Sequence, residues 1–278
     1  MIQVMFFRDL PEGYWSGPPG HRNLIKLSVP ARAGSWFPRE VAPMMGREKN
    51  MQEVKKVPMK LLDDTSIGAI AVTLPKASGV FRHYDLDFCC GGKLSLKEAC
   101  AEKGIPLSEV REKLEALQEE PPRAPQNARG ITSYIETRYH QDLRRRFPEL
   151  IALALKVEKA HHHSPHLPEG LSTFLEAFHK EMETHMKKEE EVLFPLISAG
   201  HTSVLRIPIS CMEEDHEAHG RNLRALRGLT ANFTVPDGAC VTWRALYKGL
   251  EELELELMEH INLENNVLFP KALGTLVP

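Results

Sequence analysis

An eleven-residue string occurs twice in this chain, first at residues 185–195 and again at residues 260–270. Both copies read His-x3-Glu-x2-Val-Leu-Phe-Pro. A histidine and a glutamate four residues apart lie one turn from each other on the same face of an α-helix. The proline predicts that the helix stops or kinks where the string ends. One such pair would be an ordinary polar pair on a helix surface, but its recurrence within a longer string predicts a single buried site that uses both copies.

A further histidine precedes each copy on a helical pattern. His140 comes before His185, and His216 comes before His260 at nearly the same separation. The repeat is therefore a pair of helices used twice, with one histidine on the first helix and the His-x3-Glu pair on the second. The predicted metal ligands are His140, His185, Glu189, His216, His260 and Glu264.

Long apolar stripes run through the segments that carry these ligands. They predict helices over residues 129–160, 168–198, 209–229 and 239–269. The short connections between them predict an all-α, up-down four-helix bundle. Pro148 is expected to kink the first helix. The Val-Leu pairs that lie three and four residues after the two glutamates are expected to continue the buried face; they are Val192 with Leu193 and Val267 with Leu268.

The chemistry of the ligand set favours two first-row metal ions. Imidazoles and carboxylates without a thiolate suit iron or manganese before zinc. Two histidines for each ion and two bridging glutamates leave each ion short of six ligands, so a solvent-derived oxo or hydroxo bridge and open positions are expected. The same groups buried without a metal would be costly, because polar and charged groups in an apolar core need partners.

Other polar residues near the ligands lead to separate expectations. Glu190 lies about 100° further round the helix than Glu189 and is predicted not to be needed for metal binding. His219, near the inward stripe of the third helix, is predicted to be a polar neighbour of the site. For Glu181 and Glu214 the sequence leaves a place near the site and a place on the surface equally open.

A smaller helical unit precedes the bundle. Two short helices are predicted at residues 67–74 and 76–84. Ser95 and Glu98 form a capping-box pattern that opens another helix, which Gly104 ends. The predicted domains are a small helical domain at 59–118, a proline-containing linker at 119–127 and the bundle at 128–278. Residues 1–58, punctuated by proline and glycine, are expected to be a poorly ordered extension.

Two adjacent cysteines, Cys89 and Cys90, stand in a turn just before Gly91 and Gly92. One interpretation is that both are small buried side chains that fill space. The other is that the glycines let the backbone approach another group while both thiols face it. Lys93 and the helix that follows would then favour the thiolate. The remaining cysteines are expected to be core residues: Cys100, Cys211 and Cys240.

The composition excludes several classes of function. A net charge of −3 gives no basis for binding nucleic acid or an anionic membrane surface. Five cysteines, an odd number, do not fit a secreted disulfide framework. No apolar run is long enough for a membrane span, and the N-terminus has no signal-peptide pattern, so a cytoplasmic protein is expected. A histidine-rich loop at residues 161–166 is expected to be solvated.

The bundle resembles a hemerythrin-type domain, and the six predicted ligands match the di-iron ligands of one branch of that family. The segment Asp87-Phe-Cys-Cys-Gly-Gly92 resembles the N-terminal domain of iron–sulfur cluster repair proteins, the repair-of-iron-centres family that includes the ScdA type. The resemblance covers about residues 64–273. It implies a cytoplasmic bacterial protein with two non-haem irons, bridged by an oxo or hydroxo group and by carboxylates.

The resemblance also implies a function, the restoration of iron–sulfur clusters damaged by nitric oxide or hydrogen peroxide. The implied partners are the damaged iron–sulfur proteins, and a homodimer is left open. Cys89 and Cys90 are assigned to the repair chemistry. The alternatives are a module that binds oxygen or nitric oxide and an oxidoreductase that acts on nitrogen oxides, so enzymatic activity is undecided. The paired thiols favour repair, because a gas carrier has no need of them.

Overall fold

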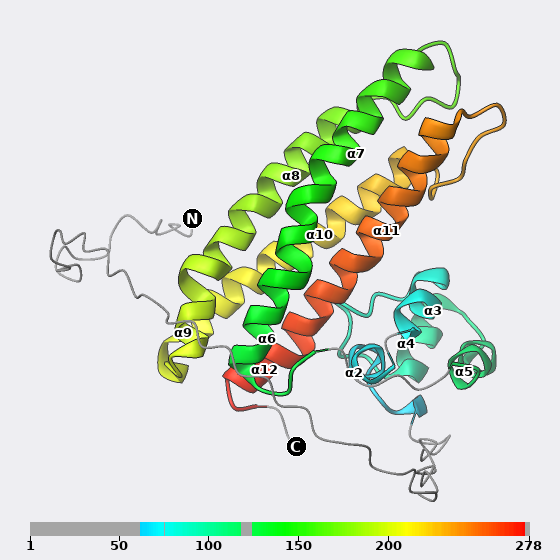
Figure 1. Ribbon diagram of the computed structural model, residues 1–278. Helices are drawn as coiled ribbons and strands as arrows, with labels where there is room; N and C mark the ends of the chain where they lie inside the picture. Colours follow the sequence, from blue (N-terminus) through cyan, green and yellow to red (C-terminus); the bar gives the residue numbers. More distant parts are fainter. Residues whose placement is uncertain (1–61, 75, 118–123, 276–278) are drawn as a thin grey trace, which may run out of the picture. The chain divides into compact units, whose positions relative to one another are not determined.

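Four long helical segments lie side by side and carry the two sequence repeats (Figure 1). The computed structural model describes residues 62–74, 76–117 and 124–275. The predicted extension at 1–58 lies outside the described residues, as does most of the predicted linker. The elements of the bundle are α6 (Ala128–Ile135), η1 (Glu136–His140), α7 (Gln141–Ala160), α8 (Leu171–Lys188), η2 (Glu189–Leu193), α9 (Phe194–Ser198), η3 (Thr202–Val204), α10 (Arg206–Leu229), α11 (Val241–Leu263), η4 (Glu264–Leu268) and α12 (Phe269–Ala272).

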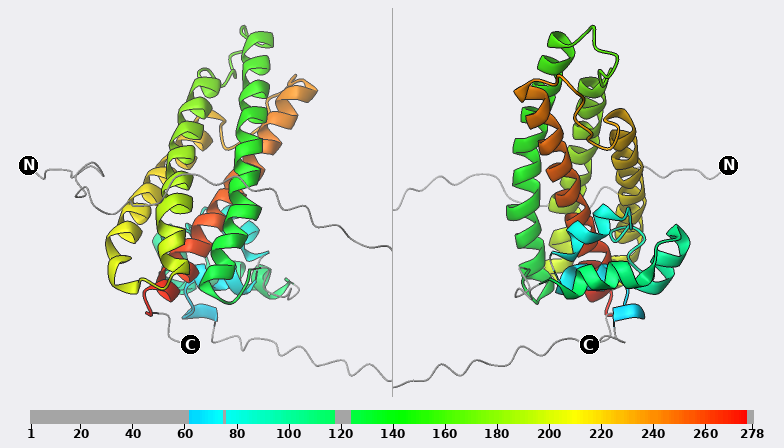
Figure 2. Two further views of the ribbon diagram at one scale, coloured as in Figure 1. Left: turned by 60° about the vertical axis from the view of Figure 1, so that its left-hand side comes forward. Right: turned by 90° about the vertical axis from the view of Figure 1, so that its right-hand side faces the viewer.

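The bundle is held together by one apolar stripe from each long helix. Helix α7 packs against α8 and α11, and α10 packs against α8. Both views in Figure 2 show the four helices running alongside one another. The largest buried side chains of this core include Phe147, Phe178 and Trp243. The prediction of an all-α chain with an up-down four-helix bundle is confirmed.

Three of the four long segments contain a wide π-helical turn next to a predicted ligand. Helix η1 ends at His140, η2 begins at Glu189, and η4 begins at Glu264. In η2 and η4 the wide turn precedes Pro195 and Pro270, which lack a backbone N–H and would clash with the carbonyl of an ordinary helical turn. The helix therefore widens and continues into α9 and α12, rather than stopping at the proline.

The wide turns also change which side chains are buried. Val192 and Val267 are only half-buried, contrary to expectation. Leu193 is 1% exposed and Leu268 is fully buried. A π turn holds more residues than an α turn, so the buried face shifts by one position along the chain. Pro148 lies inside the continuous helix α7, and the kink expected there stays a prediction.

The smaller helical unit has its own core. It consists of α2 (Ile67–Thr73), α3 (Ala77–His83), α4 (Leu96–Lys103) and α5 (Leu107–Glu115), and its buried side chains include Phe81 and Phe88. The predicted capping box of Ser95 and Glu98 is confirmed, as is the left-handed Gly104 that ends α4. Helices α2 and α3 pack against α11 of the bundle.

Close packing between the two helical units depends on glycine. A Cβ atom at Gly92 would lie 2.6 Å from Nδ2 of Asn266, and one at Gly68 would lie 2.7 Å from the same side chain. The Asn266 amide in turn donates a hydrogen bond to Oδ1 of Asn262. Gly92 thus lets its backbone approach a side chain of η4, as the second interpretation of the cysteine turn requires, but the position of the thiols is a separate question.

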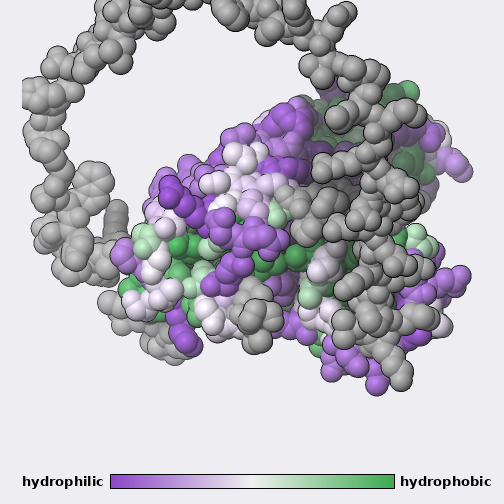
Figure 3. All heavy atoms as spheres, turned by 60° about the horizontal axis from the view of Figure 1, so that its bottom comes forward, coloured by the Kyte–Doolittle hydropathy of each residue, from purple (hydrophilic) through white to green (hydrophobic). Residues whose placement is uncertain are grey.

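The exposed face shown in Figure 3 mixes hydrophilic side chains with smaller hydrophobic patches. Among the described helices, none is both long and apolar enough to cross a membrane. The histidine-rich loop is largely exposed, as expected. Cys100 is buried as predicted, but Cys211 is exposed and Cys240 is half-buried. The expectation for Cys211 was wrong because it faces outward on α10, one position before the buried Met212.

Candidate metal centre

All six predicted ligands come together inside the bundle. They are contributed by η1, α8, η2, α10, α11 and η4, so each of the four long segments supplies at least one. Each of the six is at most 2% exposed. The structure thus forms one buried site from both copies of the repeated string.

The two glutamates divide their oxygen atoms between the histidines. Oε1 of Glu189 lies 3.4 Å from Nε2 of His185, and Oε2 lies 3.3 Å from Nε2 of His140. Oε1 of Glu264 lies 3.1 Å from Nε2 of His260. Its Oε2 lies 3.1 Å from Nε2 of His216. Each carboxylate therefore reaches two different imidazoles.

These contacts define two overlapping groups of four residues. One group contains His140 and His260 with both glutamates, and the other contains His185 and His216 with both glutamates. Within each group the potential ligand atoms all lie within 4.8 Å of one another. Two ions held in this way would share both carboxylates.

The site has the unsatisfied polar atoms that a metal would need. Within the described residues, hydrogen-bond partners are absent for Nε2 of His140, His185 and His216, and for both carboxylate oxygens of Glu189. Buried polar atoms are normally paired. Their convergence on one space, with oxygen and imidazole nitrogen as the donor atoms, fits non-haem iron.

Burial and neighbouring charges shift the pKa values of these groups. Burial, together with the charge of Glu264, raises the pKa of Glu189. Burial also lowers the pKa of His260. At His216 burial acts in the same downward direction, but the carboxylate of Glu264, with Oε2 3.1 Å from Nε2, outweighs it and raises the pKa to about 9.

In three of the four imidazoles, a polar side chain forms a hydrogen bond with Nδ1, the ring nitrogen that faces away from the site. Nδ1 of His140 lies 2.7 Å from Oε1 of Glu190. Nδ1 of His216 lies 2.8 Å from Oδ1 of Asn265. Nδ1 of His185 lies 3.2 Å from Oδ2 of Asp215. Such bonds fix the ring orientation and leave Nε2 free to bind a metal. The residues that support the imidazoles are therefore Glu190, Asn265 and Asp215.

Cationic side chains hold two of these supporting carboxylates in turn. Arg144 donates to both oxygens of Glu190, at 2.8 and 3.0 Å. Lys188 donates to Oδ2 of Asp215 at 2.8 Å. Although burial opposes it, the hydrogen bonds from Arg144 and His140 lower the pKa of Glu190. Glu190 therefore stays ionised, and its role differs from the expected one because it supports a predicted ligand.

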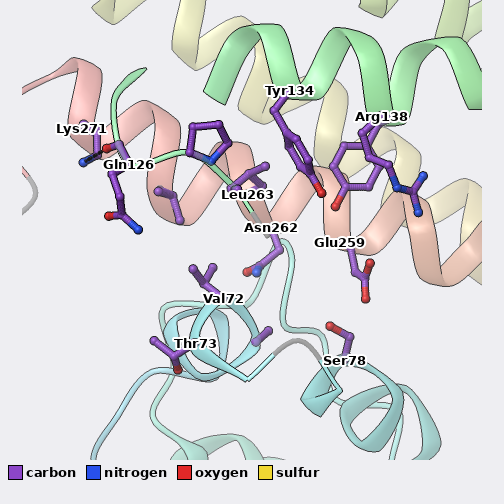
Figure 4. A pocket seen from close by; sticks show the side chains of 15 residues that line it. Val72, Thr73, Ser78, Gln126, Tyr134, Arg138, Glu259, Asn262, Leu263 and Lys271 are labelled. Atoms are coloured by element: carbon purple, nitrogen blue, oxygen red, sulfur yellow. Dashed lines mark hydrogen bonds between the residues drawn. The ribbon is translucent and has the colours of Figure 1, made fainter. Parts of the chain in front are cut away.

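The fourth imidazole, that of His260, has a different environment. Among the residues described, Nδ1 of His260 has no hydrogen-bond partner. The ring of Tyr139 stacks on it instead, with centroids 5.1 Å apart and an angle of 6° between the planes. Tyr139 also lines a cavity of about 250 Å³ between the two helical units. Figure 4 shows Tyr134, Arg138 and Glu259 around this cavity.

Other predicted neighbours of the site have mixed outcomes. His219 is buried, and its ring centroid lies 4.8 Å from that of His185, so it is a neighbour of the site as expected. Glu181 and Glu214 are both exposed. The acidic residue of α10 that reaches the site is instead Asp215, which directly precedes His216.

The two adjacent thiols lie next to the centre. Sγ of Cys90 lies 3.5 Å from the backbone carbonyl oxygen of His216, and the two sulfur atoms are 3.8 Å apart. The hydrogen bond between them raises the pKa of Cys89, which is buried, and lowers that of Cys90. Lys93, which the sequence favoured as the source of positive potential, is exposed. The positive charges that lower the pKa of Cys90 belong to His216 and Arg224.

Comparisons with known proteins agree with this arrangement. The hemerythrin HHE cation binding domain matches residues 132–272, and the domain of unknown function called ScdA_N matches residues 63–118. The iron-sulfur cluster repair protein YtfE of Edwardsiella ictaluri is 45% identical over 217 residues, which are 76% of this chain and 97% of that protein. Proteins of the same name from Cronobacter sakazakii and Escherichia coli SMS-3-5 are 45% and 43% identical over 214 residues, with the same coverage.

Proposed function

The chain belongs to the family of iron–sulfur cluster repair proteins that join an ScdA_N domain to a hemerythrin domain, and on this premise we propose that it binds two non-haem irons and restores damaged iron–sulfur clusters. The damaged clusters are those of proteins exposed to nitric oxide or hydrogen peroxide. The proposal includes the division into domains at 59–118 and 128–278. It also includes a cytoplasmic location, where a reducing environment keeps Cys89 and Cys90 as thiols.

One observation carries the di-iron assignment. The four histidines form two pairs, His140 with His260 and His185 with His216. Each glutamate of the site places one oxygen near a histidine of the first pair and the other oxygen near a histidine of the second, at 3.1 to 3.4 Å from an Nε2 atom. A single ion would need only one such group of four. Two groups that share both carboxylates support two ions with bridging glutamates.

The protein's own residues hold and orient the ligands. Glu190, Asp215 and Asn265 fix three imidazole rings, so that their Nε2 atoms face the interior of the site. Aromatic rings cover two of the same imidazoles, with Phe194 stacked on His140 and Phe269 stacked on His216. These apolar rings exclude water from the ligands on the side where the repeated string ends.

Bound iron would supply redox chemistry and exchangeable metal at this site. The thiol of Cys90 lies 3.5 Å from the backbone carbonyl oxygen of His216, and the thiol of Cys89 contacts that of Cys90. We infer that they take part in repair, because they belong to the small helical domain and yet lie next to the metal centre of the bundle. A space-filling role alone would not require the sulfur atoms to face a ligand-bearing helix.

A reconstitution experiment tests the proposal. An iron–sulfur enzyme inactivated by nitric oxide is mixed with the iron-loaded protein under reducing conditions, and recovery of its activity is followed together with its cluster absorption. We expect recovery with the wild type and with Glu191→Ala, an exposed neighbour of the site. We expect little recovery with the metal-free protein or with Glu264→Ala.

Two results would count against repair. Equal recovery with free ferrous iron at the same concentration would show that the protein adds nothing to the iron. Stoichiometric binding of nitric oxide without any recovery would favour the gas-binding alternative. Metal analysis of the same samples must give two irons per chain, because one ion per chain would contradict the di-iron assignment.

A further inference from the structure

Asp87, Cys89 and Cys90 form a cluster of potential ligands outside the bundle. We propose that these three side chains are a second metal site, which binds a thiophilic divalent ion. The choice of the physiological ion rests on the proposed repair function: it is ferrous iron released from the bundle. The cluster is one of three groups in the described residues whose ligand atoms all lie within 4.8 Å of one another.

The distances within the cluster suit chelation of one ion. The two sulfur atoms are 3.8 Å apart, and Oδ1 of Asp87 lies 3.2 Å from Sγ of Cys89. Two sulfur ligands at about 2.3 Å from a tetrahedral metal are themselves about 3.8 Å apart. Adjacent cysteines can therefore bind one ion with little movement of the sulfur atoms.

The turn that carries the cluster is already fixed in place. Oδ1 of Asp87 accepts a hydrogen bond from the backbone N–H of Cys90 at 2.9 Å. The amide of Asn265 donates to the carbonyl oxygen of Cys89 at 3.2 Å. Gly220 of α10 faces the cluster, and a Cβ atom there would lie 3.5 Å from Sγ of Cys90. The ligands are thus held by groups from both helical units.

A small cavity lies against the cluster, with a volume of about 90 Å³. Asp87 and Cys89 line it, together with the cationic side chains Arg82, Arg224 and Arg227. Two thiolates and one carboxylate around a divalent ion carry a net charge of −1. Glu254 also lines the cavity and already pairs with Arg82 and Arg227. Arg224, whose charge lowers the pKa of Cys90, would therefore contribute most to stabilising that residual negative charge.

The cluster lies close to the metal centre of the bundle, from which it would receive iron. Sγ of Cys90 lies 3.5 Å from the carbonyl oxygen of His216, whose ring is one of the predicted iron ligands. Binding at the cluster is a ligand exchange without electron transfer. The two thiols would release their protons to solvent, two bonds to sulfur and one to the Asp87 carboxylate would form, and the bonds of the ion to the imidazoles and carboxylates of the bundle would be broken.

Cobalt(II) is a suitable probe, because thiolate ligands give it an intense near-ultraviolet charge-transfer absorption that oxygen and nitrogen ligands do not. We expect this absorption when cobalt(II) is added to the reduced, iron-loaded full chain. Cys90→Ser should abolish it, and Asp87→Asn should weaken cobalt binding while keeping the oxygen that accepts from the Cys90 N–H. Cys211→Ser, which removes an exposed thiol elsewhere on α10, should leave the absorption unchanged.

Thermal unfolding of each variant shows whether the small domain remains folded. A wild-type protein without the charge-transfer absorption would overturn the proposal, and so would a Cys90→Ser variant that is folded and retains it. His260→Ala, which acts only in the bundle, should keep the cobalt signature. Loss of the signature in that variant would show that Asp87, Cys89 and Cys90 do not bind cobalt independently of the bundle, and would overturn the second site. Because this readout does not depend on repair, failed repair with an intact cobalt signature would overturn only the proposed function.

Discussion

The carboxylate of Glu190 holds the imidazole of His140, with Oε1 and Nδ1 2.7 Å apart. Asn265 holds His216 in the same way, at 2.8 Å. Each supporting residue directly follows a glutamate of the site and bonds the histidine from the first helix of its own repeat. The wide turns that begin at those glutamates point consecutive side chains at neighbouring helices. The repeat therefore encodes hydrogen-bond support as well as ligands.

Glu190→Ala should weaken iron binding by about 10- to 100-fold, because it removes the bond that orients His140 and makes it a better ligand. Glu191→Ala is the matched control, since Glu191 is the next residue and is exposed. Iron retained after dialysis against a chelator measures the effect. Identical retention in the two variants would contradict a supporting role for Glu190.

Asn265 allows two contacts to be separated. Asn265→Asp keeps an oxygen that can accept from His216 but loses the amide that donates to the Cys89 carbonyl. Asn265→Leu loses both. We expect Asn265→Asp to retain iron and Asn265→Leu to lose it readily, as followed by the optical spectrum of the iron-loaded protein. The assignment fails if the leucine variant holds iron as tightly as the aspartate variant.

The repeated string was enough to identify all six residues that meet in the centre, because the His-x3-Glu spacing and the two preceding histidines set their faces. The wide turns could not be predicted from that spacing, which is why Val192 and Val267 were expected to be buried along with the leucines that follow them. Only the position of the two prolines hinted at a widened turn.

The supporting residues were missed for a related reason. An ideal helix places Glu190 about 100° away from Glu189, which predicts a bystander. The signal was nevertheless present, since a polar residue follows the site glutamate in both copies. Asp215 could have been found from its place beside His216, but Glu214 is also acidic and directly precedes Asp215 in the chain. Only tertiary packing distinguishes them.

Removing either of the two carboxylates that we propose to bridge the irons should release most of the iron. In Glu189→Ala or Glu264→Ala, each ion loses a ligand, because both glutamates belong to both groups of four. Metal analysis should give well under two irons per chain in either variant, whereas Glu191→Ala should keep the wild-type content. Loss of just one of two ions, with the other held as tightly as before, would mean that the altered carboxylate does not bridge.

The metal-free protein should lose stability as the pH rises from about 6.5 to about 9. The nearby carboxylate of Glu264 raises the pKa of His216 from 6.5 to about 9 in the folded state, despite burial. A raised pKa means that the folded protein binds the proton more tightly, so the stabilisation is fully present below 6.5 and lost above 9. Urea unfolding at several pH values measures it. His216→Asn should flatten this dependence, and a metal-free wild type equally stable at both ends of the range would contradict it.

The two irons of the proposed centre should leave at different rates, and the one bound by His140 and His260 should leave first. His185 and His216 both have hydrogen-bonded Nδ1 atoms, so their iron is held by two oriented ligands. Within the described residues His260 has no such bond and depends on the stacked ring of Tyr139. Chelator-driven release should therefore show a fast and a slow phase of equal amplitude.

Substitution of Tyr139 tests which phase belongs to His260. Tyr139→Ala removes the stacked ring and opens the cavity wall beside His260, so the fast phase should become faster while the slow phase is unchanged. Tyr139→Phe keeps the ring and should release iron as the wild type does. A single phase for both ions in the wild type, or acceleration of the slow phase alone in Tyr139→Ala, would show that the unsupported imidazole does not make the two positions unequal.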